Sequence, residues 1–185
     1  MPRKTPVSST RRLRLPAAAL FAAAAATTTT GLPAQAAPVP GGGTAVVASG
    51  LDNPRHLTFG PDGTLYIAES GRGGAGPCAE SPEGGTACLG LSGAVTSVRW
   101  HGRAVQQRRI ITGLPSTADQ DGSSASGPAD VAVTGRGQIA VVIGLGGNPT
   151  SRAAFGPNAA KMGTVVKANI NRLGKLTVVS DVAAY

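Results

Sequence analysis

From residue 54 onward, polar and apolar positions alternate in short runs separated by glycine and proline. Apolar side chains take every second position in residues 57–59 and 131–133, and a second apolar run follows a glycine turn at 65–68 and 139–142. Alternation with a period of two, broken by Gly, Pro and Asp, predicts short β-strands joined by tight turns. No window after the N-terminal leader has the 3.6-residue period of an amphipathic helix, so we expect an all-β fold.

The same pattern occurs twice along the chain. Residues 54–68 align without a gap with residues 128–142, and each copy reads as a β-hairpin. A second hairpin follows in each copy, where residues 93–98 resemble residues 163–168 and another apolar strand comes after the next turn. Four antiparallel strands per repeat are typical of one blade of a β-propeller.

These elements predict a partial β-propeller of two four-stranded antiparallel blades, over about residues 54–114 and 128–182. One N-terminal strand, 44–51, precedes them and resembles the fourth strand of a repeat, as at 110–114. Propellers usually close with about four to eight blades, which protects their strand edges. The sequence therefore indicates a truncated chain, with a two-repeat protein that closes a ring head to tail as the alternative. Open strand edges at 44–51 and 177–182 would favour self-association.

The first 36 residues have the features of a secretory signal peptide. Five of the 17 basic residues stand among the first 14 positions, an apolar segment follows at 15–26, and Ala34-Gln35-Ala36 offers cleavage after Ala36. The apolar segment is shorter than the roughly 20 residues that a membrane-spanning helix needs, although a membrane anchor is the alternative. We expect a secreted or cell-envelope protein with no membrane span after cleavage and with a flexible linker at 37–43.

The formal net charge of +8 comes largely from this leader, because the rest of the chain has 12 basic and 9 acidic residues. Aromatic residues make up only 3% of the chain, so a nucleic-acid partner is not expected. The only two cysteines, Cys78 and Cys88, share one Gly/Pro/Ser-rich loop. In an oxidising compartment they are expected to form a local disulfide that restricts the loop, with a metal-binding or redox pair as the alternative.

Several segments after residue 36 carry a family resemblance. They are Gly50–Arg55, Phe59–Gly63, Leu65–Glu69, the loop with Cys78 and Cys88, Gly127–Asp130, Ile143–Pro149 and Asp181–Tyr185. Together they resemble the ScyD/ScyE family, named after proteins of the cyanobacterial scytonemin gene cluster. The resemblance implies an exported β-propeller of poorly defined activity whose members continue into further blades. His56 departs from the family, where a small residue is expected.

Candidate ligand-binding residues stand at the start of the first strand of each repeat. Arg55 and His56 align with Ala129 and Asp130. In a propeller the first strands are innermost, so these positions would meet at the mouth of the central channel. A histidine and an aspartate there could bind a metal or act as acid and base if other blades added groups. A solvated strand end is the alternative for Arg55, His56 and Asp130.

Asp119 and Asp121 are candidate metal ligands in an oxygen-rich turn. An EF-hand is excluded, because its sixth and twelfth positions, here Ser124 and Asp130, require glycine and glutamate. A looser calcium site and a solvated turn are both left open. Residues 71–76 match Gly-x-Gly-x-x-Gly, but a proline follows where a helix would have to begin, so no dinucleotide site is expected.

The expected function is that of a non-catalytic binding or scaffold module with an unknown ligand held across the blade loops. Two alternatives stay open. One is an enzyme related to lactonase or sugar-dehydrogenase propellers, with metal or quinone chemistry at the channel mouth, and the other is a truncated product without function. No catalytic residue and no cofactor is assigned, since the sequence has no Gly-x-Ser-x-Gly elbow and only two histidines.

Overall fold

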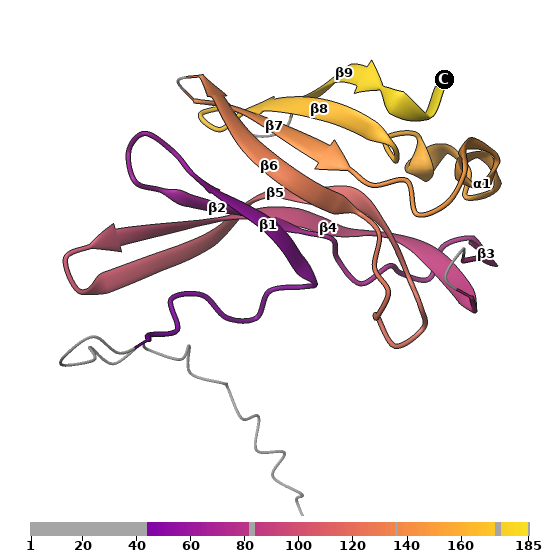
Figure 1. Ribbon diagram of the computed structural model, residues 1–185, viewed down its shortest axis with the longest axis horizontal. Helices are drawn as coiled ribbons and strands as arrows, with labels where there is room; N and C mark the ends of the chain where they lie inside the picture. Colours follow the sequence, from indigo (N-terminus) through magenta and orange to yellow (C-terminus); the bar gives the residue numbers. More distant parts are fainter. Residues whose placement is uncertain (1–43, 82–83, 136, 173–174, 185) are drawn as a thin grey trace, which may run out of the picture. The chain divides into compact units, whose positions relative to one another are not determined.

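Two antiparallel sheets, one from each sequence repeat, make up the fold in the computed structural model (Figure 1). The structure describes residues 44–81, 84–135, 137–172 and 175–184, all within one compact unit, Ala34–Tyr185. The predicted signal peptide, its cleavage site and the linker lie outside the described residues. The helices that are described are all too short or too polar to span a membrane.

The first sheet is an antiparallel meander with one short additional strand. Strands β1, β2, β4 and β5 pair in chain order, and β3 pairs with the beginning of β4, beyond the end of β2. The strands are β1 (Pro54–Phe59), β2 (Leu65–Glu69), β3 (Cys78–Glu80), β4 (Thr86–His101) and β5 (Ala104–Ala118). β4 and β5 are longer than the expected strands because their pairing continues through the loop that holds the cysteines.

The second sheet has the same meander in four strands. Two short helical segments lie in its longest connection, and the side chain of Asn148 caps the first of them by accepting a hydrogen bond from the Ser151 backbone N–H. The elements are β6 (Pro128–Gly135), β7 (Gln138–Ile143), α1 (Pro149–Ala154), η1 (Pro157–Ala159), β8 (Thr164–Asn169), β9 (Leu176–Asp181) and η2 (Val182–Ala184).

The strand pairing repeats as the sequence predicts. Leu57 pairs with Ile67 in the first sheet, and Val131 pairs with Val141 at the aligned positions of the second. In both sheets the pairing is irregular just after the proline that begins the first strand. The prediction of an all-β chain of antiparallel strands is therefore confirmed. The first sheet has one strand more than predicted, β3, and the described strands do not form a closed sheet.

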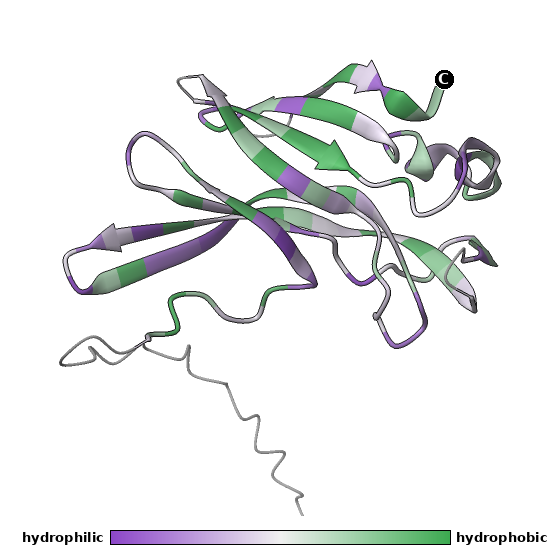
Figure 2. Ribbon diagram, viewed as in Figure 1, coloured by the Kyte–Doolittle hydropathy of each residue, from purple (hydrophilic) through white to green (hydrophobic). Residues whose placement is uncertain are grey.

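The two sheets stack through one face each, which we call their inner faces. Directly paired residues place their side chains on the same face of a sheet, so the pairing fixes both faces. The core between the sheets takes from the first sheet Tyr66, Ala68, Val95, Ile111 and Leu114, and from the second Val131, Ile139, Val141, Ile143, Val166 and Ala168. Figure 2 shows that β7 is almost wholly hydrophobic, whereas the hairpin end of β4 and β5 is largely hydrophilic.

The opposite faces of the sheets are their outer faces. On the outer face of the first sheet, Leu65, Ile67 and Val98 form a small cluster that Ala48 and Leu51 partly cover. Burying these apolar groups fixes the N-terminal segment, residues 44–53, across the sheet rather than beside one of its edges.

The N-terminal strand predicted for 44–51 is wrong. These residues make no strand pairing in the described part of the chain. A strand pairs with the free backbone edge of a sheet, whereas this segment runs across the outer face of the first sheet. The Gln107 side chain holds Ser49 instead, accepting from its N–H at 3.0 Å and donating to its carbonyl at 2.8 Å. The likeness to a fourth strand is still visible in Gly50 and Gly113, which both have positive φ (64° and 74°) and precede a leucine.

The predicted disulfide is present. Cys78 of β3 and Cys88 of β4 are directly opposite each other, with a sulfur–sulfur distance of 2.04 Å and a Cα–Cα distance of 4.0 Å. The bond closes the hairpin that β3 forms with β4, and no free cysteine is found among the described residues. The disulfide fits an oxidising environment.

Candidate functional site

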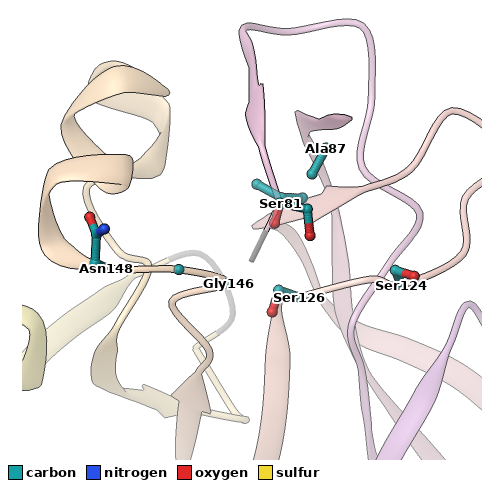
Figure 3. Close-up of a pocket in the computed structure, with 8 residues that line it drawn as sticks. Ser81, Ala87, Ser124, Ser126, Gly146 and Asn148 are labelled. Atoms are coloured by element: carbon teal, nitrogen blue, oxygen red, sulfur yellow. The ribbon is translucent and has the colours of Figure 1, made fainter. Parts of the chain in front are cut away.

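A cavity of about 400 Å³ opens between the loops at one end of the sheets (Figure 3). We call it the hydroxyl cavity. Its lining residues are Ser81, Ala87, Thr117, Ser124, Ser126, Gly146, Gly147 and Asn148. They come from the β3–β4 hairpin, the end of β5, the β5–β6 connection and the loop before α1.

Short backbone contacts hold these loops in place. Thr117 and Ser126 form an isolated antiparallel bridge, in which each backbone N–H donates to the other's carbonyl at 2.7 and 2.8 Å. Gly146 passes so close that a Cβ there would lie 2.7 Å from the Ser126 Cβ, and its φ is +65°. Ser124 also has a positive φ of 49°, which is uncommon for a residue with a side chain. The walls of the cavity are therefore built by strained or closely packed backbone.

The lining of the hydroxyl cavity is polar and neutral. Within the described part of the chain, the hydroxyl groups of Thr117, Ser124 and Ser126 make no hydrogen bond. The Asn148 carbonyl oxygen accepts hydrogen bonds from Ser151 at the start of α1, which leaves the amide NH₂ as a donor. None of the eight lining residues has a titratable side chain. The cavity can therefore offer and accept hydrogen bonds, but its own lining supplies no acid, base or charge.

The structure brings together two of the three predicted channel-mouth residues. His56 Nδ1 lies 2.5 Å from Asp130 Oδ1, and both side chains are about half exposed, at 61% and 48%. Asp130 Oδ1 also accepts the backbone N–H of Val131 at 2.7 Å. The two aligned positions are therefore in contact, and their place at a channel mouth stays a prediction. No group of three or more His, Cys, Asp or Glu that could hold a metal is found among the described residues.

Arg55 has a different environment from His56. Its guanidinium donates to the Ala125 carbonyl at 2.7 Å and to the Ser70 hydroxyl at 3.3 Å. Ser70 in turn donates to the Pro128 carbonyl at 3.0 Å. Arg55 therefore connects the first sheet to the segment that leads into the second, and these two bonds occupy its side chain.

The two predicted metal ligands, Asp119 and Asp121, have different hydrogen-bond environments. Asp121 accepts bonds from the backbone N–H and hydroxyl of Ser123, at 2.8 and 2.6 Å, and these bonds lower the pKa of its carboxyl group. Asp119 has one buried carboxylate oxygen, Oδ1, without a hydrogen-bond partner. Its backbone closes the same turn by bonding to Ser123 and Gly122. The alternative of a solvated turn fits Asp121, and among the described residues no group of three or more His, Cys, Asp or Glu includes Asp119.

An ion pair between a buried carboxylate and an exposed arginine was missed in the sequence. Glu69 is fully buried, and Arg109 donates to both of its carboxylate oxygens, with the shortest contact 2.6 Å from Nη2. Thr96 and the backbone N–H of Asp52 also donate to Glu69, at 2.5 and 2.7 Å. Burial alone would raise the pKa of Glu69, but the bonds from Arg109, Thr96 and Asp52 outweigh it and lower the pKa below its usual value of 4.5.

This ion pair anchors the N-terminal segment to the first sheet. Arg109 Nη2 also donates to the Gly50 carbonyl at 3.0 Å and to the Asp52 carboxylate at 2.9 Å. The signal was present in the repeat alignment, where Glu69 corresponds to Ile143, because a charged residue at an apolar strand position needs a partner. The hydroxyl cavity had no comparable signal, since serines in Gly/Ser-rich loops are ordinary.

Comparison of the chain with family models, with curated proteins and with solved structures finds no match. The resemblance to the ScyD/ScyE family thus stays a prediction from the sequence.

Proposed function

We propose that this chain is an exported, non-catalytic binding module of the ScyD/ScyE type, and that its two sheets are blades of a propeller. We further propose that the hydroxyl cavity binds a neutral, polyhydroxylated ligand such as a mono- or disaccharide. The carrying observation is the group of three hydroxyls, on Thr117, Ser124 and Ser126, that face the cavity without a protein partner.

The size and chemistry of the cavity support a small neutral ligand. Its volume of about 400 Å³ falls in the roughly 300–1,000 Å³ range of small-molecule sites. Hydroxyls both donate and accept hydrogen bonds, and so do the hydroxyls of a sugar. A charged ligand would lack a counter-charge in this lining, and burying it would be costly. A lining without acid or base also supports binding rather than catalysis.

The binding proposal is tested by titrating the full chain with a panel of neutral mono- and disaccharides, followed by amide NMR spectra. We expect saturable shifts at Thr117, Ser126 and Gly146. Thr117→Val and Ser126→Ala each remove one hydroxyl and should weaken binding by about 2–10-fold, the value of one net hydrogen bond. Ser180→Ala, on exposed β9, is the matched control. The proposal fails if no sugar gives saturable shifts or if the control weakens binding equally.

The proposed export is tested by the intact mass of the chain recovered outside its host cells. A chain that begins at Ala37, with thiols unreactive until reduced, would support the signal peptide and the oxidising compartment together. A mass that still includes the first 36 residues would contradict cleavage after Ala36.

The His56–Asp130 contact favours a second candidate, an enzyme related to lactonase propellers. A histidine paired with an aspartate can act as a general base. The test is lactone hydrolysis by the full chain, with and without added Ca²⁺. Turnover that disappears in His56→Asn but persists in Ser126→Ala would support the enzyme over the binding module.

A further inference from the structure

The outer face of the first sheet exposes large apolar side chains whose equivalents in the second sheet are covered. Leu57 and Phe59 are 53% and 61% exposed, whereas Val131, which aligns with Leu57, is 1% exposed. Val133, which aligns with Phe59, packs against the core. Trp100 is 38% exposed on the same face, and its ring lies 6.4 Å from the ring of Phe59. Contiguous exposed apolar groups of this size mark an interaction surface.

The interface between the two sheets identifies what fits this surface. Within the chain, the side chains of Val131, Val141 and their neighbours are covered by the inner face of the first sheet, around Ala68 and Val95. By the repeat alignment, the outer face of the first sheet corresponds to the inner face of the second sheet, which is the covered one. The surface that fits it is therefore one that corresponds to the inner face of the first sheet, around Ala68 and Val95.

That complement is present on the same chain and is uncovered. Val142 aligns with Ala68 and is 40% exposed, while Ala68 itself is fully buried. Val165, which aligns with Val95, is only half-buried. Val142 and Val165 are directly paired, and Ala140 and Ala132 form the next pair along the outer face of the second sheet. The small side chains of Ala132 and Ala140 leave room for the larger Leu57, Phe59 and Trp100. Lys167 pairs with Ala140 on the same face, so its aliphatic stem must lie along the contact while its amine reaches solvent.

The N-terminal segment already supplies part of the cover. Ala48 and Leu51 pack on the outer face of the first sheet, at the places that Ile111 and Leu114 of β5 take on the second. Within the chain, β1, β2 and β4 of the first sheet cover the rest of the inner face of the second sheet. The equivalent area on the outer face of the first sheet includes Leu57 and Phe59, and no described residue covers it.

We propose that a second copy of this chain docks the outer face of its second sheet onto the outer face of the first sheet. The contact repeats the sheet-on-sheet stack that each chain already contains, except at the fourth strand, whose place on the first sheet is already taken by the segment 44–51. Because the two faces differ, the interface is heterologous, and each added copy exposes a fresh face. Association therefore continues past a dimer, until the copies close into a ring.

The test compares the full chain with variants that block one face each, by sedimentation velocity over a range of concentrations. Phe59→Glu blocks the outer face of the first sheet, and Val142→Glu blocks that of the second. Leu91→Glu, at a 50% exposed leucine of β4 near neither patch, is the matched control. We expect the wild type and the control to form species larger than a dimer, and each blocked variant alone to sediment as a monomer.

Mixing the two blocked variants separates this proposal from other modes of association. Each variant keeps one intact face, and the two intact faces are complementary, so a one-to-one mixture should give a species of twice the monomer mass and nothing larger. A mixture that stays monomeric overturns the proposal. Association of Val142→Glu with itself also overturns it, because that would mean a symmetric contact through Phe59 or through the leader.

Phe59 and Val142 are both exposed, so their substitution should not disrupt the core. Far-UV circular dichroism and urea unfolding are the checks that each variant is folded. A second pair, Leu57→Lys and Ala132→Glu, repeats the experiment on the same two faces. If the second pair leaves association intact while both variants are folded, the faces do not carry the contact and the proposal is wrong. A wild type that is monomeric at all concentrations also overturns it.

Discussion

Glu69 and Ile143 occupy the same place in the two sheets, because each is paired with the proline that begins the first strand of its sheet, Pro54 or Pro128. Both are buried, yet one is a carboxylate and the other is apolar. The partners of Glu69 differ in the same way, since Thr96 and Arg109 correspond by strand pairing to Val166 and Val178. The first sheet therefore has a charged, hydrogen-bonded group at the position where the second sheet has an apolar side chain.

Removing the charge of Glu69 alone should destabilise the fold strongly. Glu69→Gln removes the buried carboxylate to which Arg109 and Thr96 donate and leaves Arg109 paired with Asp52 alone, and we expect a loss of about 1.5–3 kcal/mol in the free energy of unfolding. The triple variant Glu69→Ile/Thr96→Val/Arg109→Val copies the apolar set of the second sheet. It should lose less than Glu69→Gln, because it leaves no buried polar group in the place of the carboxylate and no arginine without its partner.

Urea unfolding of the three proteins measures this difference. The triple variant also removes the bonds that hold Gly50 and Asp52, so amide hydrogen exchange should accelerate in the segment 44–53 while the second sheet is unchanged. A triple variant that is less stable than Glu69→Gln would mean that the ion pair contributes more than its isosteric replacement.

Acid should weaken the fold through the same carboxylate. The pKa of Glu69 is lowered in the folded chain, so its contribution to stability is fully present above its usual value of 4.5 and is lost as the pH falls through the folded pKa. The hydrogen bond from Arg152 lowers the pKa of Asp181 as well, and it acts in the same direction. Unfolding midpoints measured from pH 7 to pH 2 should decline below about pH 4.5, more steeply in the wild type than in Glu69→Gln. Parallel curves would exclude Glu69 as a source of the decline.

Much of the fold follows from local sequence, because a two-residue period and glycine turns are decided by neighbouring residues. The alignment of residues 54–68 with 128–142 therefore gave both the strands and their partners. Segment 44–51 has the same local pattern but forms no strand. Its conformation depends on where a free backbone edge lies, and Gln107, distant in sequence, bonds to it instead.

The candidate site is less predictable for the same reason. The proximity of His56 and Asp130 could be predicted from the sequence because the two residues occupy the same position in the two repeats. The hydroxyl cavity is assembled from the end of β5 and three separate connections, and the bridge between Ser126 and Thr117 holds two of its walls together. Nothing near Ser126 in the sequence distinguishes it from the other serines of that loop.

Reducing the disulfide should loosen one wall of the hydroxyl cavity. Cys78 and Cys88 tie β3 to β4, and Ser81 and Ala87 of that hairpin line the cavity. The variant Cys78→Ser/Cys88→Ser should lose about 2–3 kcal/mol of stability, as expected for a short closed loop. Urea unfolding with and without reductant measures the loss, and amide exchange should rise mainly in β3. Equal exchange in oxidised and reduced protein would contradict this role.

The His56–Asp130 contact should contribute little to stability. Both side chains are about half exposed, and exposed ion pairs are worth about 0–1 kcal/mol. A double-mutant cycle with His56→Asn and Asp130→Asn, measured by urea unfolding, should give a coupling energy within that range. A much larger coupling would show that the contact helps to hold the two sheets together, and would weaken its interpretation as a site.

Gly146→Ala tests whether the hydroxyl cavity depends on close backbone approach. The φ of +65° disfavours any side chain there, and the new methyl group would lie 2.7 Å from the Ser126 Cβ and 3.0 Å from the Thr117 hydroxyl. We expect a loss of about 1–2 kcal/mol in stability, together with loss of saturable sugar binding. Gly84→Ala is the matched control, since Gly84 also has a positive φ of 91° but would meet nothing within 4 Å. It should lose similar stability from backbone strain and keep its binding, so equal loss of binding in both variants would mean that strain, rather than the filled cavity, is responsible.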